Sequence, residues 1–393
     1  MARKNFWKVI LLIFFIAFTF RIGFAFYLEE RFYFDDEHEY WKIVNNFISG
    51  RGLMVAENLK AYRPPLYPLF IALLVKTGFT ITGIRIVQSF LSAITCVFIY
   101  LISKKIFSER VALLSCFLSA IYPFFIFYTG FLLTETFFIF LVVLCALTMF
   151  TLVEPKVFPS YGLVFGATSG FAGLCRPTME LFFPFCLLFI LFSADNNIIR
   201  LKKILFAFAG FILVLTPWII RNYIAIGKFV PGTTMGGAVF WEGNNPFSEG
   251  GPCRYFPEGV WQVDEAQRDR VFYSLTFECI KKDPQRFLRL LGKKFFRFWN
   301  IVPNAAEYST NFYRALSVLS FGLLLPFFIL GLFITKHSLK TLFLVWTIGF
   351  FTIFHMIFLA SIRYRVAIEP FVIMFASNGF LWLIFQLKGI NKS

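Results

Sequence analysis

Long apolar segments alternate with short polar ones along the whole chain. A helix that spans a bilayer needs roughly 20 apolar residues, and about ten segments approach or reach this length. They lie at residues 7–28, 84–102, 111–128, 136–153, 160–175, 178–194, 201–220, 313–335, 339–360 and 366–387. The pattern predicts an all-α polytopic membrane protein with a bundle of about ten transmembrane helices.

One further apolar run, residues 66–79, has a length that favours a helix lying at the membrane surface over one that crosses. With this run at the surface, every short basic loop falls on one side, which the positive-inside rule assigns to the cytoplasm. The basic residues concerned are Arg3, Lys4, Lys8, Lys104, Lys105, Arg110, Lys156, Arg200, Lys202, Lys203, Lys336, Lys340, Lys388 and Lys392. We therefore expect a multi-pass protein with both termini cytoplasmic. The abundance of Phe and the lack of an evident retention signal favour the cell inner (plasma) membrane.

The composition supports the same class of protein. Hydrophobic residues make up 58% of the chain and charged residues only 15%, which excludes an ordinary soluble globular protein. The net charge of +16 does not indicate a nucleic-acid partner, because Lys and Arg lie in short clusters between apolar runs, where membrane orientation accounts for them. The basic N-terminus is similar to that of a signal peptide, but its apolar part is too long and no small-residue cleavage site follows. We expect it to remain as the first span.

The order of the segments predicts three regions: residues 1–220, an N-terminal transmembrane module that contains the first outer loop (29–83); residues 221–312, an extracytoplasmic loop region; and residues 313–393, the C-terminal transmembrane helices. Two helices are expected in the outer region, at 264–282 and 285–299. The second has apolar residues at helical spacing, which is typical of an amphipathic helix lying on the outer leaflet. Its remaining positions carry Arg286, Arg289, Lys293, Lys294 and Arg297.

Acidic residues mark the outer side of the predicted bundle. A cluster follows the first span directly, at Asp35, Asp36, Glu37, His38 and Glu39. Arg63 lies in the same loop, so an acid and a base share one membrane-surface loop. A second acid, Glu135, stands in an otherwise apolar stretch at the outer mouth of a span, where it is either a catalytic partner or an interface residue.

Arginines also gather on the predicted outer side, against the charge bias of the topology, at Arg63, Arg176, Arg221, Arg363 and Arg365. Arg21 lies inside the first span, where a cation is costly. Any one of them could extend to the interface or pair with a nearby carboxylate. Several together indicate an anion site, because the planar guanidinium matches two phosphate oxygens and keeps its charge.

Cofactor motifs are few. There is no P-loop or dinucleotide fingerprint, and no Cys/His set has the spacing of a zinc site. A divalent metal held by Asp36, Glu37 or His38 is left open. Cys253 and Cys279 share the outer region, but no spacing rule requires them to form a disulfide.

The chain resembles the integral-membrane GT-C glycosyltransferases, specifically glycosyltransferase family 39, which contains the protein O-mannosyltransferases and the lipid A aminoarabinose transferase. The motifs that carry the resemblance, besides an Arg in the first span, are Asp36-Glu37 with Tyr40, Arg63-Pro64-Pro65 with Tyr67-Pro68, Thr134-Glu135, Arg176-Pro177, Pro217-Trp218 with Arg221-Asn222-Tyr223, Gly243-Asn244-Asn245-Pro246, and Arg363-Tyr364-Arg365. One departure is Tyr62, where the aminoarabinose transferase has an acid. This puts a metal at that position in doubt.

The resemblance implies a GT-C-like bundle with outer juxtamembrane helices and an active site on the extracytoplasmic face. It implies transfer of a sugar from a polyprenyl-phosphate donor to an acceptor hydroxyl of a glycan, lipid or protein, with no metal or other cofactor required and with membrane lipids as surroundings. Asp36 is then the candidate general base, with Glu135 and Glu37 as further catalytic candidates. The candidate donor-phosphate residues are Arg63, Arg176, Arg221, Arg363, Arg365 and Tyr364, and the candidate substrate-loop residues are Tyr40, Asn244 and Asn245.

Two other classes fit part of the pattern. A ligase or polymerase of polyprenyl-linked glycans uses similar donors but transfers whole oligosaccharides. A lipid or solute transporter also has many spans and buried charges, but it is expected to carry polar residues near the bilayer centre and similar halves. Here the charges gather at one face and no internal repeat is evident.

Overall fold

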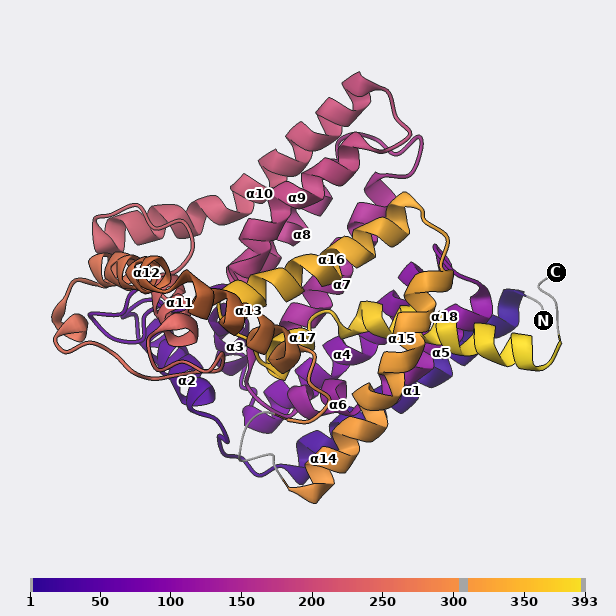
Figure 1. Ribbon diagram of the computed structural model, residues 1–393, viewed down its shortest axis with the longest axis horizontal. Coiled ribbons are helices and arrows are strands. Elements are labelled where there is room, and N and C mark those ends of the chain that lie inside the picture. The colour runs from indigo at the N-terminus through magenta and orange to yellow at the C-terminus, as the bar shows by residue number, and fades with distance from the viewer. Residues whose placement is uncertain (1–2, 304–309, 390–393) are drawn as a thin grey trace.

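The computed structural model describes residues 3–303 and 310–389, and these residues form helices and loops without a β-strand (Figure 1). Seven segments among them are long and apolar enough to cross a membrane: α1 (Arg3–Tyr27), α4 (Ile81–Lys104), α7 (Thr134–Leu152), α10 (Asn197–Ile226), α14 to α15 (Asn311–Ile334, with π-helical Val318–Gly322 between them), α16 (Leu339–Ile357) and α18 (Glu369–Leu387). The prediction of an all-α polytopic membrane protein is confirmed.

The predicted number of ten spans is not confirmed among the described residues, where seven helices, or eight with a bent pair, are long and apolar enough. An eighth span would be the pair α5 (Glu109–Ile121) and α6 (Pro123–Thr129), which is bent by 48°. The two remaining predicted spans are the short helices α8 (Tyr161–Cys175) and α9 (Thr178–Leu191), of 15 and 14 residues. Both are shorter than the roughly 20 residues that a full crossing needs.

Close packing explains how the short α8 nevertheless lies against the bundle. A Cβ at Gly166 would lie 1.9 Å from the carbonyl oxygen of Ala207 in α10, and one at Gly210 would lie 2.4 Å from that of Leu163. The two backbones therefore approach more closely than any larger residue would allow, as is common where small residues line helix interfaces in membranes.

Arg21 has its partner in the break between α5 and α6. This fully buried side chain donates to the carbonyl oxygens of Ala120 (2.7 Å) and Ser119 (3.0 Å) and to Ser92 Oγ (2.8 Å). Pro123 cannot donate a backbone hydrogen bond, so the last carbonyls of α5 are left open. The negative end of this helix takes the place of a carboxylate partner.

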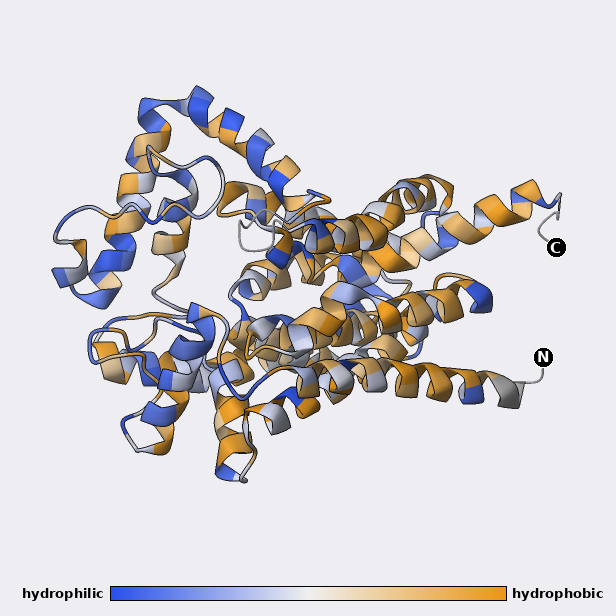
Figure 2. Ribbon diagram, turned by 90° about the horizontal axis from the view of Figure 1, so that it is seen from below, coloured by the Kyte–Doolittle hydropathy of each residue, from blue (hydrophilic) through white to orange (hydrophobic). Residues whose placement is uncertain are grey.

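The polar loops lie at two opposite ends of the bundle (Figure 2). At the end near both termini, Lys105 and Lys340 contact Glu154 at 2.7 and 3.1 Å, and the buried Lys203 contacts Asp195 at 2.6 Å. These loops are the ones that the charge pattern predicts to share one side of the membrane. Arg3 and Lys4 have undescribed side chains, and Lys392 lies outside the described residues.

The other end carries the shorter helices that build the site (Figures 1 and 2). They are α2 (Asp35–Ile48), α3 (Leu66–Lys76), α11 (Gly236–Asn244), the 3-10 turn η1 (Val260–Gln262), α12 (Glu265–Lys282), α13 (Pro284–Phe298) and α17 (Ile362–Arg365). With 11 residues, α3 is too short to cross a bilayer. The two helices expected in the outer region correspond to α12 and α13.

One position of α13 differs from its expected place. Lys294 was assigned to the polar face of an amphipathic helix, but it is fully buried. The reason is tertiary, because α13 packs against α16 and α17, and Lys294 points into that contact.

Candidate active site

The site begins at the first turn of α2, where three acids precede the rest of the helix. Acidic side chains are favourable there because the N-terminus of a helix is electropositive. Glu37 Oε2 accepts hydrogen bonds from the backbone N–H groups of Tyr33 (2.6 Å) and Phe34 (2.9 Å), and its Oε1 accepts one from Leu132 (2.8 Å). Glu37 therefore fixes the start of α2 to the segment that precedes α7.

Asp36, one residue earlier, faces two arginines from distant parts of the chain. Arg63 Nη2 donates to Asp36 Oδ1 at 2.7 Å, and Arg363 Nη1 donates to Asp36 Oδ2 at 2.6 Å. Arg63 also donates twice to Glu39, from Nε at 2.8 Å and from Nη2 at 2.5 Å. Asp36 and Glu39 lie three residues apart, on one face of α2.

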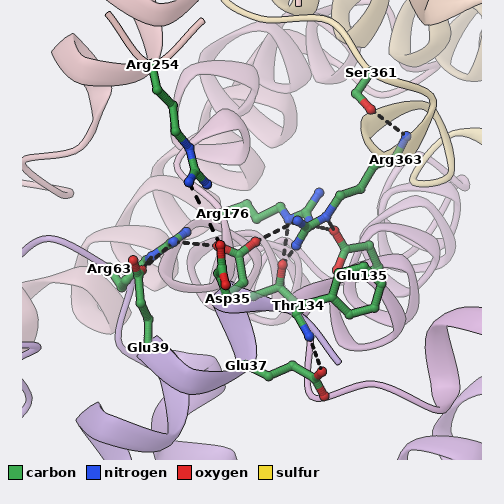
Figure 3. Close-up of polar contacts among 12 residues, drawn as sticks. Asp35, Glu37, Glu39, Arg63, Thr134, Glu135, Arg176, Arg254, Ser361 and Arg363 are labelled. Atoms are coloured by element: carbon green, nitrogen blue, oxygen red, sulfur yellow. Dashed lines mark hydrogen bonds and ion pairs between the residues drawn. The ribbon is translucent and has the colours of Figure 1, made fainter. Parts of the chain in front are cut away.

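Glu135, at the start of α7, closes the network on its other side. Its Oε1 accepts hydrogen bonds from Arg363 Nε and, at 2.5 Å, from Arg176 Nη2. Arg176 also donates to Thr134 Oγ1 at 2.7 Å. Figure 3 shows Arg176 and Arg363 converging on Thr134 and Glu135, with Arg63 on the opposite side of the α2 acids. Arg363 is the bridge between the two halves.

The network alternates three guanidinium groups with three carboxylates, and we call these six residues the charged network: Glu39, Arg63, Asp36, Arg363, Glu135 and Arg176. Glu135 is 1% exposed, whereas Asp36 and Arg363 are 25% and 28% exposed. The network is therefore buried at Glu135 and accessible where Asp36 meets Arg363.

Burial alone would raise the pKa of Asp36, but the guanidinium groups of Arg63 and Arg363 hold it well below its ordinary value. Asp36 is therefore ionised in the unliganded protein. Glu135 Oε2 is buried and has no hydrogen-bond partner among the described residues. Oε2 therefore keeps an unused capacity to accept a hydrogen bond.

Two other predicted site residues line the network. Tyr40 is buried in α2, with the Arg63 guanidinium 5.4 Å from its ring centre. Tyr364 stacks on His355 at 4.6 Å, and the Arg176 guanidinium lies 5.9 Å from its ring centre. These rings restrict where the guanidinium groups can move.

Two predicted phosphate-binding arginines lie outside the charged network. Arg221 donates to the carbonyl oxygens of Lys60 (2.6 Å) and Leu53 (2.7 Å) and so holds the first outer loop. Arg365 is fully buried, pairs with Glu369 at 2.8 Å and donates to the carbonyl oxygen of Asn300. The structure does not bring either guanidinium to Asp36.

The predicted substrate-loop residues Asn244 and Asn245 are buried and hold backbone. Asn244 Nδ2 donates to the carbonyl oxygen of Ile357 at 3.1 Å, and Asn245 Nδ2 donates to that of Cys253 at 3.0 Å. Their amide groups are used inside the protein.

Sequence reasoning assigned no role to two acids, Glu39 of the charged network and Glu242 near it. Glu39 could have been recognised from its spacing of three residues from Asp36 within a helix. Glu242, in α11, forms no hydrogen bond or ion pair that ties it to another described residue. Burial raises the pKa of Glu242, and the negative charge of Asp36 raises it further, whereas Arg254 and Arg63 oppose the shift.

The residues considered for a divalent metal do not fit one. Both oxygens of Asp36 are paired with arginines, both oxygens of Glu37 accept backbone N–H groups, and the exposed His38 packs on the ring of Phe32 at 5.0 Å. Within residues 3–303 and 310–389, no three His, Cys, Asp or Glu side chains are placed to hold a metal ion.

Comparisons with known proteins agree with the resemblance seen in the sequence. Residues 62–220 match the family described as dolichyl-phosphate-mannose-protein mannosyltransferase. No curated protein matches the chain by sequence.

Similar solved structures include that of the Archaeoglobus fulgidus oligosaccharyltransferase tethered to an acceptor peptide (TM-score 0.63, 13% identity, covering 98% of this chain and 50% of that one). The same enzyme, AglB, with an inhibitory peptide and a dolichol-phosphate gives a TM-score of 0.62 at 13% identity, with 98% and 51% covered. A further structure of it contains Zn and sulfate (TM-score 0.59, 17% identity, 97% and 49% covered). A weaker likeness is to ArnT from Cupriavidus metallidurans bound to undecaprenyl phosphate (TM-score 0.46, 13% identity, 97% and 78% covered).

The likeness to the oligosaccharyltransferase shows that the fold is shared. The chain spans about half the length of that enzyme. The matched family and the shared fold confirm the resemblance to GT-C glycosyltransferases.

Proposed function

We propose that this chain is a membrane glycosyltransferase. The premise is its resemblance to the GT-C glycosyltransferases in fold and, over residues 62–220, in sequence. The enzyme transfers a sugar from a polyprenyl-phosphate donor to the hydroxyl group of a glycan, lipid or protein acceptor. The observation that carries this proposal is the convergence of Arg63, Arg363 and Arg176 with Asp36 and Glu135 at one end of the bundle. AglB, which shares the fold, is known in complex with a dolichol-phosphate.

The phosphate of the donor is expected to bind at Arg63 and Arg363. The bond between the anomeric carbon and the phosphate oxygen breaks during transfer, and the electron pair of that bond stays on the phosphate. Preplaced guanidinium groups stabilise this developing charge. The surrounding apolar helices accommodate the isoprenoid chain.

Asp36 is the proposed general base. It takes the proton of the acceptor hydroxyl as the acceptor oxygen bonds to the anomeric carbon. In the unliganded protein Asp36 is a weak base, because Arg63 and Arg363 lower its pKa. A phosphate that competes for these arginines would weaken their contacts with Asp36 and raise its pKa. Donor binding would therefore strengthen the base.

Glu135 is proposed to hold Arg363 and Arg176 through Oε1 and to orient a substrate hydroxyl through its free Oε2. The sequence suggested direct roles in catalysis or phosphate binding for three residues that we now propose as positioning residues, Glu37, Arg221 and Arg365. The polar atoms of Glu37 and Arg221 contact backbone groups, and Arg365 pairs with a buried carboxylate.

The proposed membrane orientation follows the charge pattern. We place the protein in the inner (plasma) membrane. The end of the bundle that carries the two termini then faces the cytoplasm, and the charged network lies on the extracytoplasmic side. The division into 1–220, 221–312 and 313–393 also remains a proposal. No step requires a metal, because the carboxylates of the network already pair with arginines.

Donor competition tests the proposal. The purified protein in lipid nanodiscs is given a monosaccharide linked to polyprenyl monophosphate, an oligosaccharide linked to polyprenyl diphosphate, or both, with mixed acceptor alcohols. We expect release of polyprenyl monophosphate from the first donor alone. Consumption of only the oligosaccharide donor would favour a ligase or polymerase, and movement of intact lipid across vesicles without release would favour a transporter.

A further inference from the structure

Lys294 of α13 has a buried amino group whose hydrogen-bond acceptors, in the described part of the chain, are all neutral. Burial, and to a lesser extent the nearby Arg286, lowers the pKa of this group to about 7. The amino group donates to Asn244 Oδ1 (2.8 Å) and to the carbonyl oxygens of Phe358 (2.9 Å) and Ile357 (3.1 Å). Ile357 is the last residue of α16. The last carbonyls of a helix lack partners within it and carry partial negative charge, so a cation at this point satisfies both needs.

Further contacts hold the same stretch of backbone. Arg297 Nε, also on α13, donates to the carbonyl oxygen of Ala360 at 3.1 Å. From the other side, α11 approaches so closely that a Cβ at Gly243 would lie 1.9 Å from the carbonyl oxygen of Phe358. Residues 357–360 are therefore packed between α11 and α13, with hydrogen bonds from α13.

This stretch leads directly to the arginine that bridges the charged network. Ser361 caps α17, its Oγ accepting from the backbone N–H of Arg363 at 3.3 Å. Arg363 then reaches Asp36 and Glu135. A shift of residues 357–360 would move the guanidinium away from one carboxylate or the other, because a bridge between two fixed partners tolerates little displacement.

We infer that Lys294 is a positioning residue for Arg363, acting through the backbone of residues 357–360, with Asn244 as its partner on α11. The inference rests on the proposed function only for its kinetic consequence. It assigns to the outer segment 221–312 a part in setting the geometry of the site.

The test compares Lys294→Met with Lys293→Met in the full-length protein in nanodiscs. Met keeps most of the side-chain volume of Lys and removes its charge and donors. Lys293 is an exposed neighbour on the same helix that pairs with Glu249, so it is a matched control. We expect turnover to fall about tenfold to hundredfold in Lys294→Met, since small misplacements of a catalytic group have effects of this size. The donor KM should change by less than about threefold, and Lys293→Met should match the wild type.

A double-mutant cycle separates positioning from general destabilisation. If Lys294 acts through Arg363, Lys294→Met should cause no further loss in an Arg363→Ala background. An equal fold-loss in both backgrounds would overturn the inference. Lys294→Arg, which keeps a cation for the carbonyls, should recover part of the turnover.

Hydrogen exchange gives a readout that needs no turnover. Amides of residues 357–363 should exchange faster in Lys294→Met than in the wild type and in Lys293→Met, with the rest of the bundle unchanged. Unchanged exchange in 357–363 would overturn the inference, and exchange that rises throughout would show a general fold defect and overturn it too. A wild type that is inactive with every polyprenyl-phosphate sugar would contradict the proposed function alone. If Lys294→Met does not fold, the same exchange comparison is made on Asn244→Ala, where protection of 357–363 should fall.

Discussion

Arg363 is the residue at which the proposed mechanism can be tested most sharply by substitution. It uses two different nitrogen atoms for two carboxylates, Nη1 for Asp36 at 2.6 Å and Nε for Glu135. In Arg363→Ala each carboxylate keeps one arginine, Arg63 or Arg176, so the remaining pairs survive and the protein should fold. The bridge between α2 and α7 is lost.

The size of the effect follows from what the guanidinium is proposed to do. Loss of one preplaced donor to a developing charge costs about 10²–10³-fold in turnover, and donor affinity should change less, because the contact strengthens as the phosphate leaves. Arg363→Lys keeps the charge but has a single nitrogen, which cannot reach two carboxylates in the same geometry. We expect its turnover to lie within about tenfold of the Ala variant.

The assay is single-turnover release of polyprenyl monophosphate, with donor affinity measured separately. Arg289 is the control, since it is 67% exposed on α13 and its one ion pair with a described residue is a long one, to Asp283 at 3.9 Å. Ala and Lys substitutions at Arg289 should both leave turnover unchanged. Wild-type turnover in Arg363→Lys would refute the bridging role, and wild-type turnover in both Arg363 variants would remove the phosphate-site proposal.

Asp36→Asn keeps the shape but removes the base, so turnover should fall about 10²-fold or more with donor binding retained; near-normal turnover would assign the base to another acid. Ionised Asp36, whose folded pKa is lowered by Arg63 and Arg363, stabilises the fold above the ordinary Asp pKa, and this contribution is lost as pH falls through the folded value. Removing Arg63 brings that folded value closer to the ordinary one, so on acidification below the ordinary Asp pKa the thermal midpoint of Arg63→Ala should fall by less, and level off at a higher pH, than that of the wild type; coincident acid limbs would contradict this. In a cysteine-free background, a cysteine at the exposed Lys202 should be protected from an impermeant thiol reagent in intact cells, while one at the exposed Glu249 should react; the reverse labelling would invert the topology.

The sequence predicted most of the bundle because span length and loop charge are local properties. It also predicted that residues 66–79 form a helix too short to cross, which the 11-residue α3 bears out. The number of spans was less predictable. Glycine-mediated packing lets the 15-residue α8 lie deep against α10, so an apolar run need not be a full crossing.

The residues of the site were only partly separable by sequence. Arg63, Arg221 and Arg365 give the same signal, an arginine at an outer helix end, yet only Arg63 meets Asp36, while Arg221 meets backbone carbonyls. The pairing of Arg363 with Glu135 joins residues 228 apart in the chain, and only the folded structure shows it. The spacing of polar residues in α13 predicted an exposed Lys294, but its amino group donates to a carbonyl oxygen at the C-terminal end of α16.

The central claim is that Arg63 and Arg363 exchange carboxylate partners for the phosphate of a lipid-linked sugar. The measurement that tests it most directly is an experimental structure of the protein in a nanodisc with a polyprenyl monophosphate. We expect phosphate oxygens about 3 Å from guanidinium nitrogens of Arg63 or Arg363, with at least one of the two contacts to Asp36 released. A phosphate bound elsewhere, with the charged network intact, would contradict it.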